Sequence, residues 1–299
     1  MRNLFLALTL IVSFLSVSAQ HLGTEYRLKK VVEVPGRQGI AADENYFYIS
    51  DTKGLYKYDK NWNLVAKRVQ SDSDPLFPNP KLANHFGDID VWNGRIYTGN
   101  EKFEYGRGFN IAISVYDAET LEWIEDIPWC AESGQVEVSG LAVDREKNMI
   151  WMSDWVDSRY VYGYSLETGK YYTKMQCRPM PYWTQGIFIC DGKMLIAADD
   201  GESTYHIADN IYIADITQVP YSGLKDGTEV VRDTPFSVKL DKNGKVVTRT
   251  GKIAAGAMGG RLELFREIKD FRRAGESEGM CIDPTTNDTA TIPFEPTSL

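Results

Sequence analysis

The sequence predicts an all-β fold built from a repeated four-stranded unit. The first observation is a recurring phrase in which a polar or aromatic residue and a glycine precede an apolar run. Its glycines stand 48, 53, 46 and 93 residues apart, and the last gap is about twice the others; they are Gly39, Gly87, Gly140, Gly186 and Gly279. The second observation is a composition with 17 Tyr and 7 Trp among 299 residues. A period of about 40–50 residues in such a chain is typical of a single β-propeller with four-stranded blades.

The strands are expected in the same order within each repeat. After each glycine an apolar strand ends in an Asp/Asn/Gly turn, and these residues tolerate the positive φ that tight turns between antiparallel strands require. A second strand then ends on a short polar residue, 12, 13, 14 and 13 residues after the glycine: Asp51, Asn100, Asp154 and Asp199. Third and fourth strands follow with the period-two alternation of half-buried strands. Four repeats therefore each have four predicted strands.

The segment between the fourth and fifth phrases has two possible arrangements. Residues 219–260 are either a degenerate blade or an insertion. In the first case, Phe236–Leu240 and Val246–Ile253 are strands of an additional blade. In the second case, Leu262–Ile268 returns as the outer strand of the fourth blade. The balance favours five blades over six.

The final unit, from Gly279 to Leu299, is too short for a complete blade. An N-terminal strand often completes the last blade of a propeller, and Arg27–Val34 is the candidate here. Even with this strand, the last blade is one strand short.

The first 19 residues have the features of a secretory signal peptide. Arg2 supplies a positive start, Leu4–Leu15 is a short apolar run, and Val17–Ala19 places small residues before a cut ahead of Gln20. No later segment is long and apolar enough to span a membrane. We therefore expect a secreted or periplasmic protein whose residues 20–299 form the propeller domain.

Charge and cysteine content limit the classes of partner. The formal net charge is −9, and no Lys/Arg cluster is present, which argues against nucleic acid as a partner. The four cysteines lack C-x-x-C spacing, so a zinc knot is not expected. Export permits disulfides, and Cys177 and Cys190 are placed so that they could meet. Buried free thiols are the alternative.

Polar residues are expected to converge on one face of the propeller. In this fold the residues before each inner strand and those after each second strand lie on the same rim. The glycine itself is explained by crowding around the axis, where a side chain would not fit. The residues beside it are thus the functional variable, and the candidate ligand-binding residues are Gln38, Glu137, Gln185, Asp154, Asp199 and Trp183.

His85 is the candidate general base. A histidine near the channel mouth beside Asp88 could be oriented by that carboxylate and could exchange a proton near neutral pH. His85 and Asp88 are therefore the candidate catalytic residues. A histidine that is simply hydrogen-bonded within a loop is the alternative.

Several aromatic residues fall in predicted rim loops, where the packing of blades does not require them. Flat aromatic side chains beside carboxylates and amides favour the binding of sugar rings. The set is Tyr105, Phe109, Tyr182, Trp183 and Tyr205.

The segments Glu137–Asp144 (EVSGLAVD) and Glu276–Asp283 (ESEGMCID) resemble inner-strand motifs of calcium-dependent propellers. The group includes gluconolactonase-type, strictosidine-synthase-like and phytase-like propellers, and the resemblance covers roughly residues 38–283. In gluconolactonase-like members a Glu before the glycine is a metal ligand. The resemblance thus implies Glu278 as a metal ligand and Ca²⁺ as a candidate cofactor.

Three functions are consistent with these observations. The leading one is a secreted propeller that binds a small or carbohydrate-like ligand at the channel mouth. The second is a Ca²⁺-dependent lactone or ester hydrolase, with Glu278 and Asp88 as ligands and His85 as the base. The third is a protein-interaction scaffold with residues 219–260 as its contact surface.

Overall fold

The structure is a computed structural model that describes residues 20–23, 26–105, 107–156, 158–199, 209–217, 237–240, 246–250, 258–268 and 276–294. The predicted signal peptide, the loop with Tyr205, and most of 219–260 lie outside these residues. The described part is all β, apart from one short 3-10 turn, Ala131–Ser133. Within it, no helix has the length and apolar character needed to cross a membrane.

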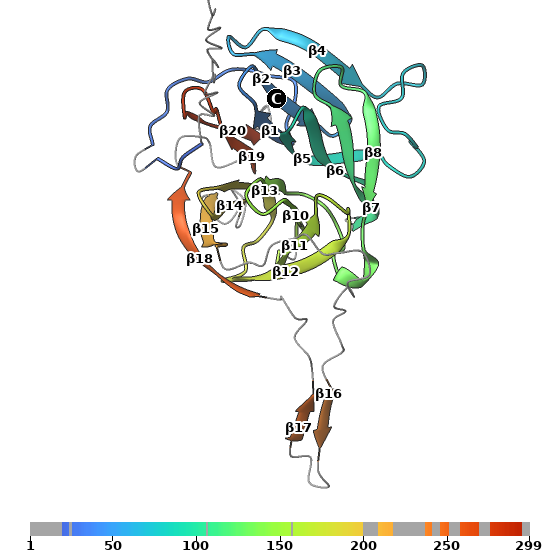
Figure 1. Ribbon diagram of the computed structural model, residues 1–299, viewed down its shortest axis with the longest axis vertical. Helices are drawn as coiled ribbons and strands as arrows, with labels where there is room; N and C mark the ends of the chain where they lie inside the picture. Colours follow the sequence, from blue (N-terminus) through green and yellow to red (C-terminus); the bar gives the residue numbers. More distant parts are fainter. Residues whose placement is uncertain are drawn as a thin grey trace, which may run out of the picture.

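The first two sheets are antiparallel and follow the chain order (Figure 1). The first contains β1 (Gly39–Ala42), β2 (Tyr46–Asp51), β3 (Gly54–Asp59) and β4 (Leu64–Val69). The second contains β5 (His85–Trp92), β6 (Arg95–Glu104), β7 (Arg107–Asp117) and β8 (Trp123–Pro128).

Eight further strands form one sheet with two four-stranded halves. One half is β9 (Leu141–Asp144), β10 (Met149–Ser153), β11 (Tyr160–Ser165) and β12 (Tyr171–Arg178). The other is β13 (Thr184–Cys190), β14 (Lys193–Ala198), β15 (Asn210–Asp215) and β18 (Met258–Glu267). Strand β18 pairs antiparallel with β15 and parallel with β12, so the outer strands join the halves. Of the two arrangements left open by the sequence, β18 follows the second, because it returns as the outer strand beside β15.

Two further strand pairs complete the described structure. The hairpin of β16 (Ser237–Leu240) and β17 (Val246–Thr250) is a separate two-stranded sheet that extends from the lower end in Figure 1. Strands β19 (Glu276–Ile282) and β20 (Thr289–Phe294) form the last sheet.

The prediction that Arg27–Val34 is a strand is wrong, because residues 26–34 contain no strand. Leu28 and Val31 are 52% and 69% exposed, whereas Val34 is half-buried against the core, so only one end of this segment packs on the sheets. The segment and the residues before it are held near the last sheet by side chains instead. Lys29 forms an ion pair with Asp288, and Gln20 Nε2 donates to the carbonyl of Ile282 at 2.6 Å.

The inner strands β1, β5, β9, β13 and β19 form a closed ring, because each contacts the next and β19 contacts β1. Their glycines allow this close approach. A Cβ on Gly279 would lie 2.6 Å from the Cα of Gly39, and one on Gly186 would lie 2.7 Å from the Cα of Gly279. Real Cβ atoms do not approach so closely. The packing role expected for the glycines is therefore confirmed.

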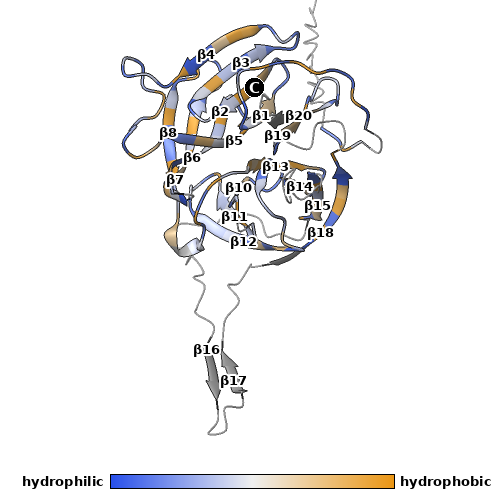
Figure 2. Cartoon of the chain, turned by 180° about the vertical axis from the view of Figure 1, so that it is seen from behind, coloured by the Kyte–Doolittle hydropathy of each residue, from blue (hydrophilic) through white to orange (hydrophobic). Residues whose placement is uncertain are grey.

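Burial differs from inner to outer strands. All residues of β9, β10 and β13 are buried, whereas β4 is exposed at alternate positions or more. Figure 2 shows hydrophilic and hydrophobic positions interspersed along β4. The core consists of clusters between neighbouring sheets, rich in rings such as Trp151, Tyr116 and Tyr164, which explains the aromatic composition. All four cysteines are free, and three of them are buried.

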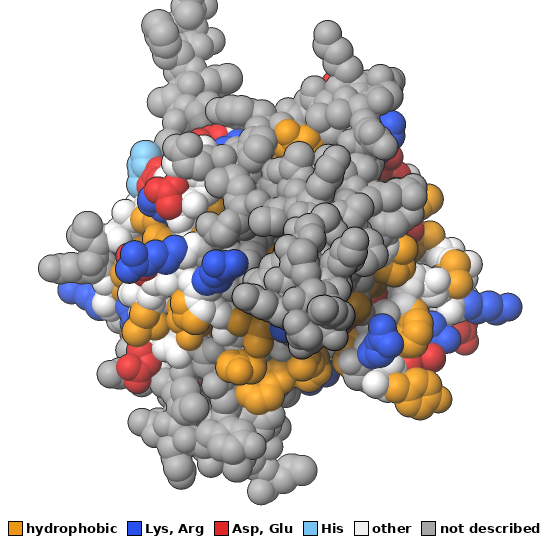
Figure 3. Space-filling view, turned by 90° about the horizontal axis from the view of Figure 1, so that it is seen from below, with side chains coloured by type: hydrophobic (Ala, Val, Ile, Leu, Met, Phe, Trp, Pro, Cys, Tyr) orange, Lys and Arg blue, Asp and Glu red, His pale blue; other side chains and the backbone are white. Residues whose placement is uncertain are grey.

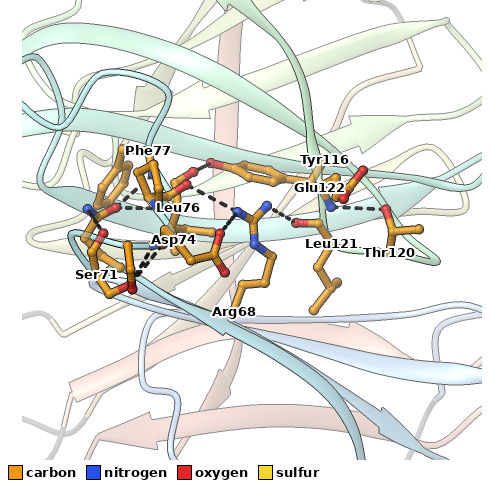
Figure 4. Close-up of polar contacts among 12 residues, drawn as sticks. Arg68, Ser71, Asp74, Leu76, Phe77, Tyr116, Thr120, Leu121 and Glu122 are labelled. Carbon is orange, nitrogen blue, oxygen red and sulfur yellow. Dashed lines mark hydrogen bonds and ion pairs between the residues drawn. The ribbon is translucent and has the colours of Figure 1, made fainter.

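The loop between β4 and β5 fastens the first sheet to the second (Figure 4). The guanidinium of Arg68 donates to the carbonyl of Leu121 at 3.1 Å and to Asp74 Oδ1 at 2.6 Å. Tyr116 Oη donates to the carbonyl of Leu76 at 2.9 Å. On the face in Figure 3, basic and a few acidic side chains are scattered over the coloured part, and hydrophobic side chains gather at its lower centre.

Candidate functional site

One end of the ring collects the polar side chains. Inner strands run antiparallel to the strands that follow them, so the start of one lies beside the end of the next: His85 pairs with Glu101, and Thr184 with Ala198. We call this end the polar rim and define it by these residues: Arg37, Gln38, His85, Glu101, Phe103, Glu137, Ser139, Asp154, Trp155, Tyr182, Trp183, Gln185, Asp199, Glu276 and Glu278.

Bulges at the glycine phrase aim side chains toward the axis. The register shifts between Phe86 and Ile89 in β5, between Thr184 and Gly186 in β13, and between Ser277 and Met280 in β19. A bulge leaves a residue unpaired and redirects its neighbours, and bulges are frequent beside functional sites. Here the three bulges contain Asp88, Gln185 and Glu278.

Asp88 lies within the ring itself. Its Oδ1 accepts from the N–H of Ile89 at 2.8 Å, and its Oδ2 accepts from the N–H groups of Ile187 at 3.1 Å and Leu141 at 3.5 Å. A Cβ on Gly279 would lie 2.2 Å from Oδ1. Burial raises the pKa of Asp88 well above its ordinary value, although the backbone donors oppose the shift. This carboxyl group thus links inner strands at the axis.

The carboxylate beside His85 is that of Glu101. His85 Nδ1 lies 3.4 Å from Glu101 Oε1, and the two side chains are 20% and 0% exposed. Both atoms are buried and lack a hydrogen bond within the described residues. Glu101 Oε2 accepts from the N–H of Val138 at 3.0 Å, which fixes the carboxylate. Asp88 was expected to orient His85, but its oxygens accept backbone N–H bonds instead. The carboxylate that lies beside His85 is that of Glu101.

A second buried carboxyl group, that of Glu137, lies against Glu101. Glu137 contacts Glu101, and burial raises the pKa of Glu137 well above its ordinary value, with the charges of Glu101 and Asp154 adding to the shift. Asp154 is fixed in turn, since its Oδ1 accepts from the N–H groups of Val136 at 2.9 Å and Glu137 at 3.1 Å, and its Oδ2 accepts from Tyr162 Oη at 2.9 Å. A protonated Glu137 can donate a hydrogen bond to Glu101.

Glu278 belongs to another carboxyl pair, nearer the axis. It is buried and contacts Glu276, and burial raises its pKa well above the ordinary value, with Glu276 and Asp88 adding to the shift. Gln185 Nε2 donates to Glu276 Oε2 at 3.1 Å. Ser139 Oγ donates to Gln185 Oε1 at 3.3 Å. Gln185 and Glu278 are thus in one network through Glu276.

Aromatic rings border these carboxyl groups. The ring of Phe103 lies 5.5 Å from that of His85 and 6.2 Å from that of Trp155. The carbonyl of Trp155 accepts from the N–H of Thr184 at 3.0 Å, which ties its loop to that of Trp183. Trp183 has a left-handed φ of 49°, and its ring lies 6.1 Å from that of Tyr182, which is 53% exposed. Non-glycine residues rarely adopt this backbone conformation, and it concentrates at functional sites.

The other residues predicted to bind a ligand form backbone hydrogen bonds or lie at exposed positions. Asp199 is buried, and its N–H donates to the carbonyl of Trp183 at 3.1 Å. Gln38 contributes backbone bonds, with its N–H donating to Ser50 at 3.0 Å and its carbonyl accepting from Gly279 at 3.3 Å. Tyr105 and Phe109 lie near the tip of the β6–β7 hairpin and are 98% and 45% exposed.

Phe103 and Trp155 were not singled out by the sequence reasoning. Trp155 directly follows Asp154, the polar residue that marks a strand end in the third repeat. Phe103 is two residues beyond Glu101, on a strand that runs past the repeat pattern. A search for aromatic residues just after each strand-end position would have found Trp155.

The residues implied as Ca²⁺ ligands do not fit that role. Ca²⁺ takes six to eight oxygen ligands. The Asp88 oxygens accept backbone N–H bonds, which a cation would displace, and Glu278 is paired with Glu276. No group of three or more His, Cys, Asp or Glu side chains in the described ranges is arranged to hold a metal ion.

No protein-family model matches the chain, and no curated protein has a significantly similar sequence.

Proposed function

We propose that the protein is an exported five-bladed β-propeller that binds a small carbohydrate-like ligand at the polar rim. The closed ring of inner strands supports the propeller assignment, because each inner strand begins its own sheet or half-sheet. The last blade would contain only β19 and β20 among the described residues. Export rests on the N-terminal sequence pattern alone.

The observation that carries the binding proposal is that Phe103, Trp155 and Trp183, all half-buried, border the buried carboxyl groups of the polar rim, with the rings of Phe103 and Trp155 in contact. Sugar rings present apolar faces that stack on aromatic rings, and their hydroxyl groups bond to carboxylates and amides. Pockets for small ligands combine these two elements in the same way. The side chains of Glu101 and Gln185 are already fixed by bonds within the rim, so binding needs little additional ordering.

A glycan array with the full-length mature protein tests this proposal. We expect selective binding that is lost in Trp155→Ala and weakened in Trp183→Ala. Trp123→Ala is the matched control, because Trp123 is 42% exposed on the outer strand β8 and is remote from the rim. Equal binding by Trp155→Ala and Trp123→Ala, or no selective binding by the wild type, would contradict the proposal.

A second candidate is hydrolysis of an ester or lactone at the same rim, and the His85–Glu101 contact favours it. A histidine beside a buried carboxylate is suited to remove a proton from water as the water oxygen attacks the acyl carbon. The proton then passes to the leaving oxygen as the C–O bond breaks. A panel of nitrophenyl esters and sugar lactones tests this, and the activity must fall at least about 100-fold in His85→Gln.

The scaffold function remains a proposal of lower rank. Its support in the described residues is the hairpin β16–β17, which pairs only with itself there. Binding of a partner equally well after removal of residues 219–260 would contradict it.

A further inference from the structure

A cavity lies at the other end of the ring, away from the polar rim. It has a volume of about 560 Å³ and is lined by the turns that follow β1, β5, β9 and β13, and by Pro284 after β19. We call it the turn-side cavity. Because the glycine ring and Asp88 lie between the two ends, this cavity is distinct from the rim site. Its volume lies within the range of about 300–1,000 Å³ that small-molecule sites have.

The lining is predominantly acidic. Its five acidic residues among those described are Asp43, Glu44, Asp144, Glu146 and Asp191, and its two permanent cations are Arg145 and Lys147. The surplus of negative charge favours a cationic occupant.

Both cationic side chains already bond to other groups of the protein. Arg145 Nη2 lies 2.7 Å from Asp90 Oδ1 and also donates to the carbonyl of Val91 at 3.0 Å. Lys147 Nζ donates to the carbonyl of Ile216. An anionic ligand would therefore compete with bonds that already exist.

Asp144 supplies an acceptor that the protein leaves unused. It is 2% exposed, and its Oδ1 accepts from the N–H of Lys147 at 3.0 Å. Its Oδ2 has no hydrogen-bond partner within the described residues. A buried acceptor without a partner is costly, at about 1–3 kcal/mol, so a ligand that donates to it gains that amount.

The cavity also offers apolar surface, from Trp92, Val91, Ile189 and Pro284. The guanidinium of Arg145 lies 5.5 Å from the ring centre of Trp92, which places positive charge against this indole already. An occupant with an apolar body and one positive end matches both parts of the lining.

We propose that the turn-side cavity binds a small organic amine, with the ammonium group held by the carboxylates around Asp144 and the apolar body against Trp92. This site is independent of the ligand proposed for the polar rim.

Phenethylamine and the neutral isostere 2-phenylethanol are suitable probes, titrated into the full mature protein by calorimetry. We expect saturable binding of the amine, at least about tenfold tighter than that of the alcohol, because a charged hydrogen bond contributes about 1.5–3 kcal/mol. Asp144→Asn should weaken amine binding about tenfold while keeping the Oδ1 acceptor that the turn needs. Glu146→Gln, at an exposed position, should weaken it less.

Glu122→Gln is the charge-matched control, since Glu122 is exposed and outside the cavity, and it should bind the amine as the wild type does. Equal affinity for amine and alcohol, absence of saturable amine binding, or equal binding by Asp144→Asn and Glu122→Gln would overturn the proposal. Trp155→Ala should leave amine binding unchanged, so failure of this site and failure of the rim site are distinguishable.

Discussion

His85 Nδ1 lies 3.4 Å from Glu101 Oε1, with both atoms buried at the polar rim. Because the carboxylate can only accept when ionised, we expect neutral His85 to carry its proton on Nδ1, which leaves Nε2 as an acceptor. The ¹⁵N chemical shifts of the imidazole report the tautomer directly. The chain has three histidines, so single variants assign the signals.

The exposed His21 provides an internal comparison. A dominant Nε2–H form of His85 at neutral charge would contradict the proposed orientation by Glu101. A dominant Nδ1–H form would support both the binding and the hydrolysis proposals for the rim.

Gly279→Ala should destabilise the fold severely. Its Cβ would lie 2.2 Å from Asp88 Oδ1 and 2.6 Å from the Cα of Gly39, so the ring must open to accept it. We expect a loss of more than about 3 kcal/mol in the free energy of unfolding, measured by urea denaturation, or failure to fold. Gly94→Ala is the control, because its Cβ meets open space and only the positive φ of 72° opposes it, at a cost of about 1 kcal/mol. Similar losses in the two variants would contradict the close packing of the ring.

The elements around these glycines could be predicted because their signals are local. The apolar runs after Gly39, Gly87, Gly140 and Gly186, with their tight turns, are strands in the structure. The partner of β18 could not be chosen from sequence, since an apolar alternation does not say which edge it joins. The strand expected at Arg27–Val34 rested on how propellers complete their last blade and not on a signal in these residues, and the structure has no strand there.

The sequence also predicted where the polar rim lies, but it did not predict which side chains contact each other within the rim. Antiparallel topology alone places His85, Glu137 and Glu278 at one end of the ring. The bulge at Gly87–Asp88 turns Asp88 toward the axis, and nothing in the local sequence distinguishes that bulge from regular pairing. Glu101 therefore takes the position beside His85.

Glu278→Gln should change how stability depends on pH. The pKa of Glu278 is raised in the folded state by burial, so the folded protein holds a proton that the unfolded chain releases above about pH 4.3. Stability is thus lost as the pH rises from that value toward the folded-state pKa. Urea denaturation across this range should show a shallower loss in the variant.

Asp215→Asn serves as the opposite case. Hydrogen bonds from Lys193 and Thr217 lower the pKa of Asp215, so its contribution is lost as the pH falls. Asp215→Asn should leave the loss of stability above about pH 4.3 as it is in the wild type. If Glu278→Gln and the wild type lose stability in parallel there, Glu278 is not protonated in the folded protein.

Glu137→Gln should preserve the fold better than Glu137→Ala. Its carboxyl group contacts Glu101 and accepts from the N–H of Trp155, and a neutral amide can supply both a donor and an acceptor. We expect a difference of about 1–3 kcal/mol between the two variants in the free energy of unfolding. Equal stability of the two would show that the Glu137 side chain forms neither bond in solution.

A crystal structure of the mature protein with its best saccharide from the glycan array decides whether the polar rim is the binding site. The proposal predicts density for a sugar ring at the polar rim, stacked on Trp155 and within hydrogen-bond distance of His85 Nε2. A saccharide bound elsewhere on the molecule, with Trp155 and His85 free of it, would contradict the claim.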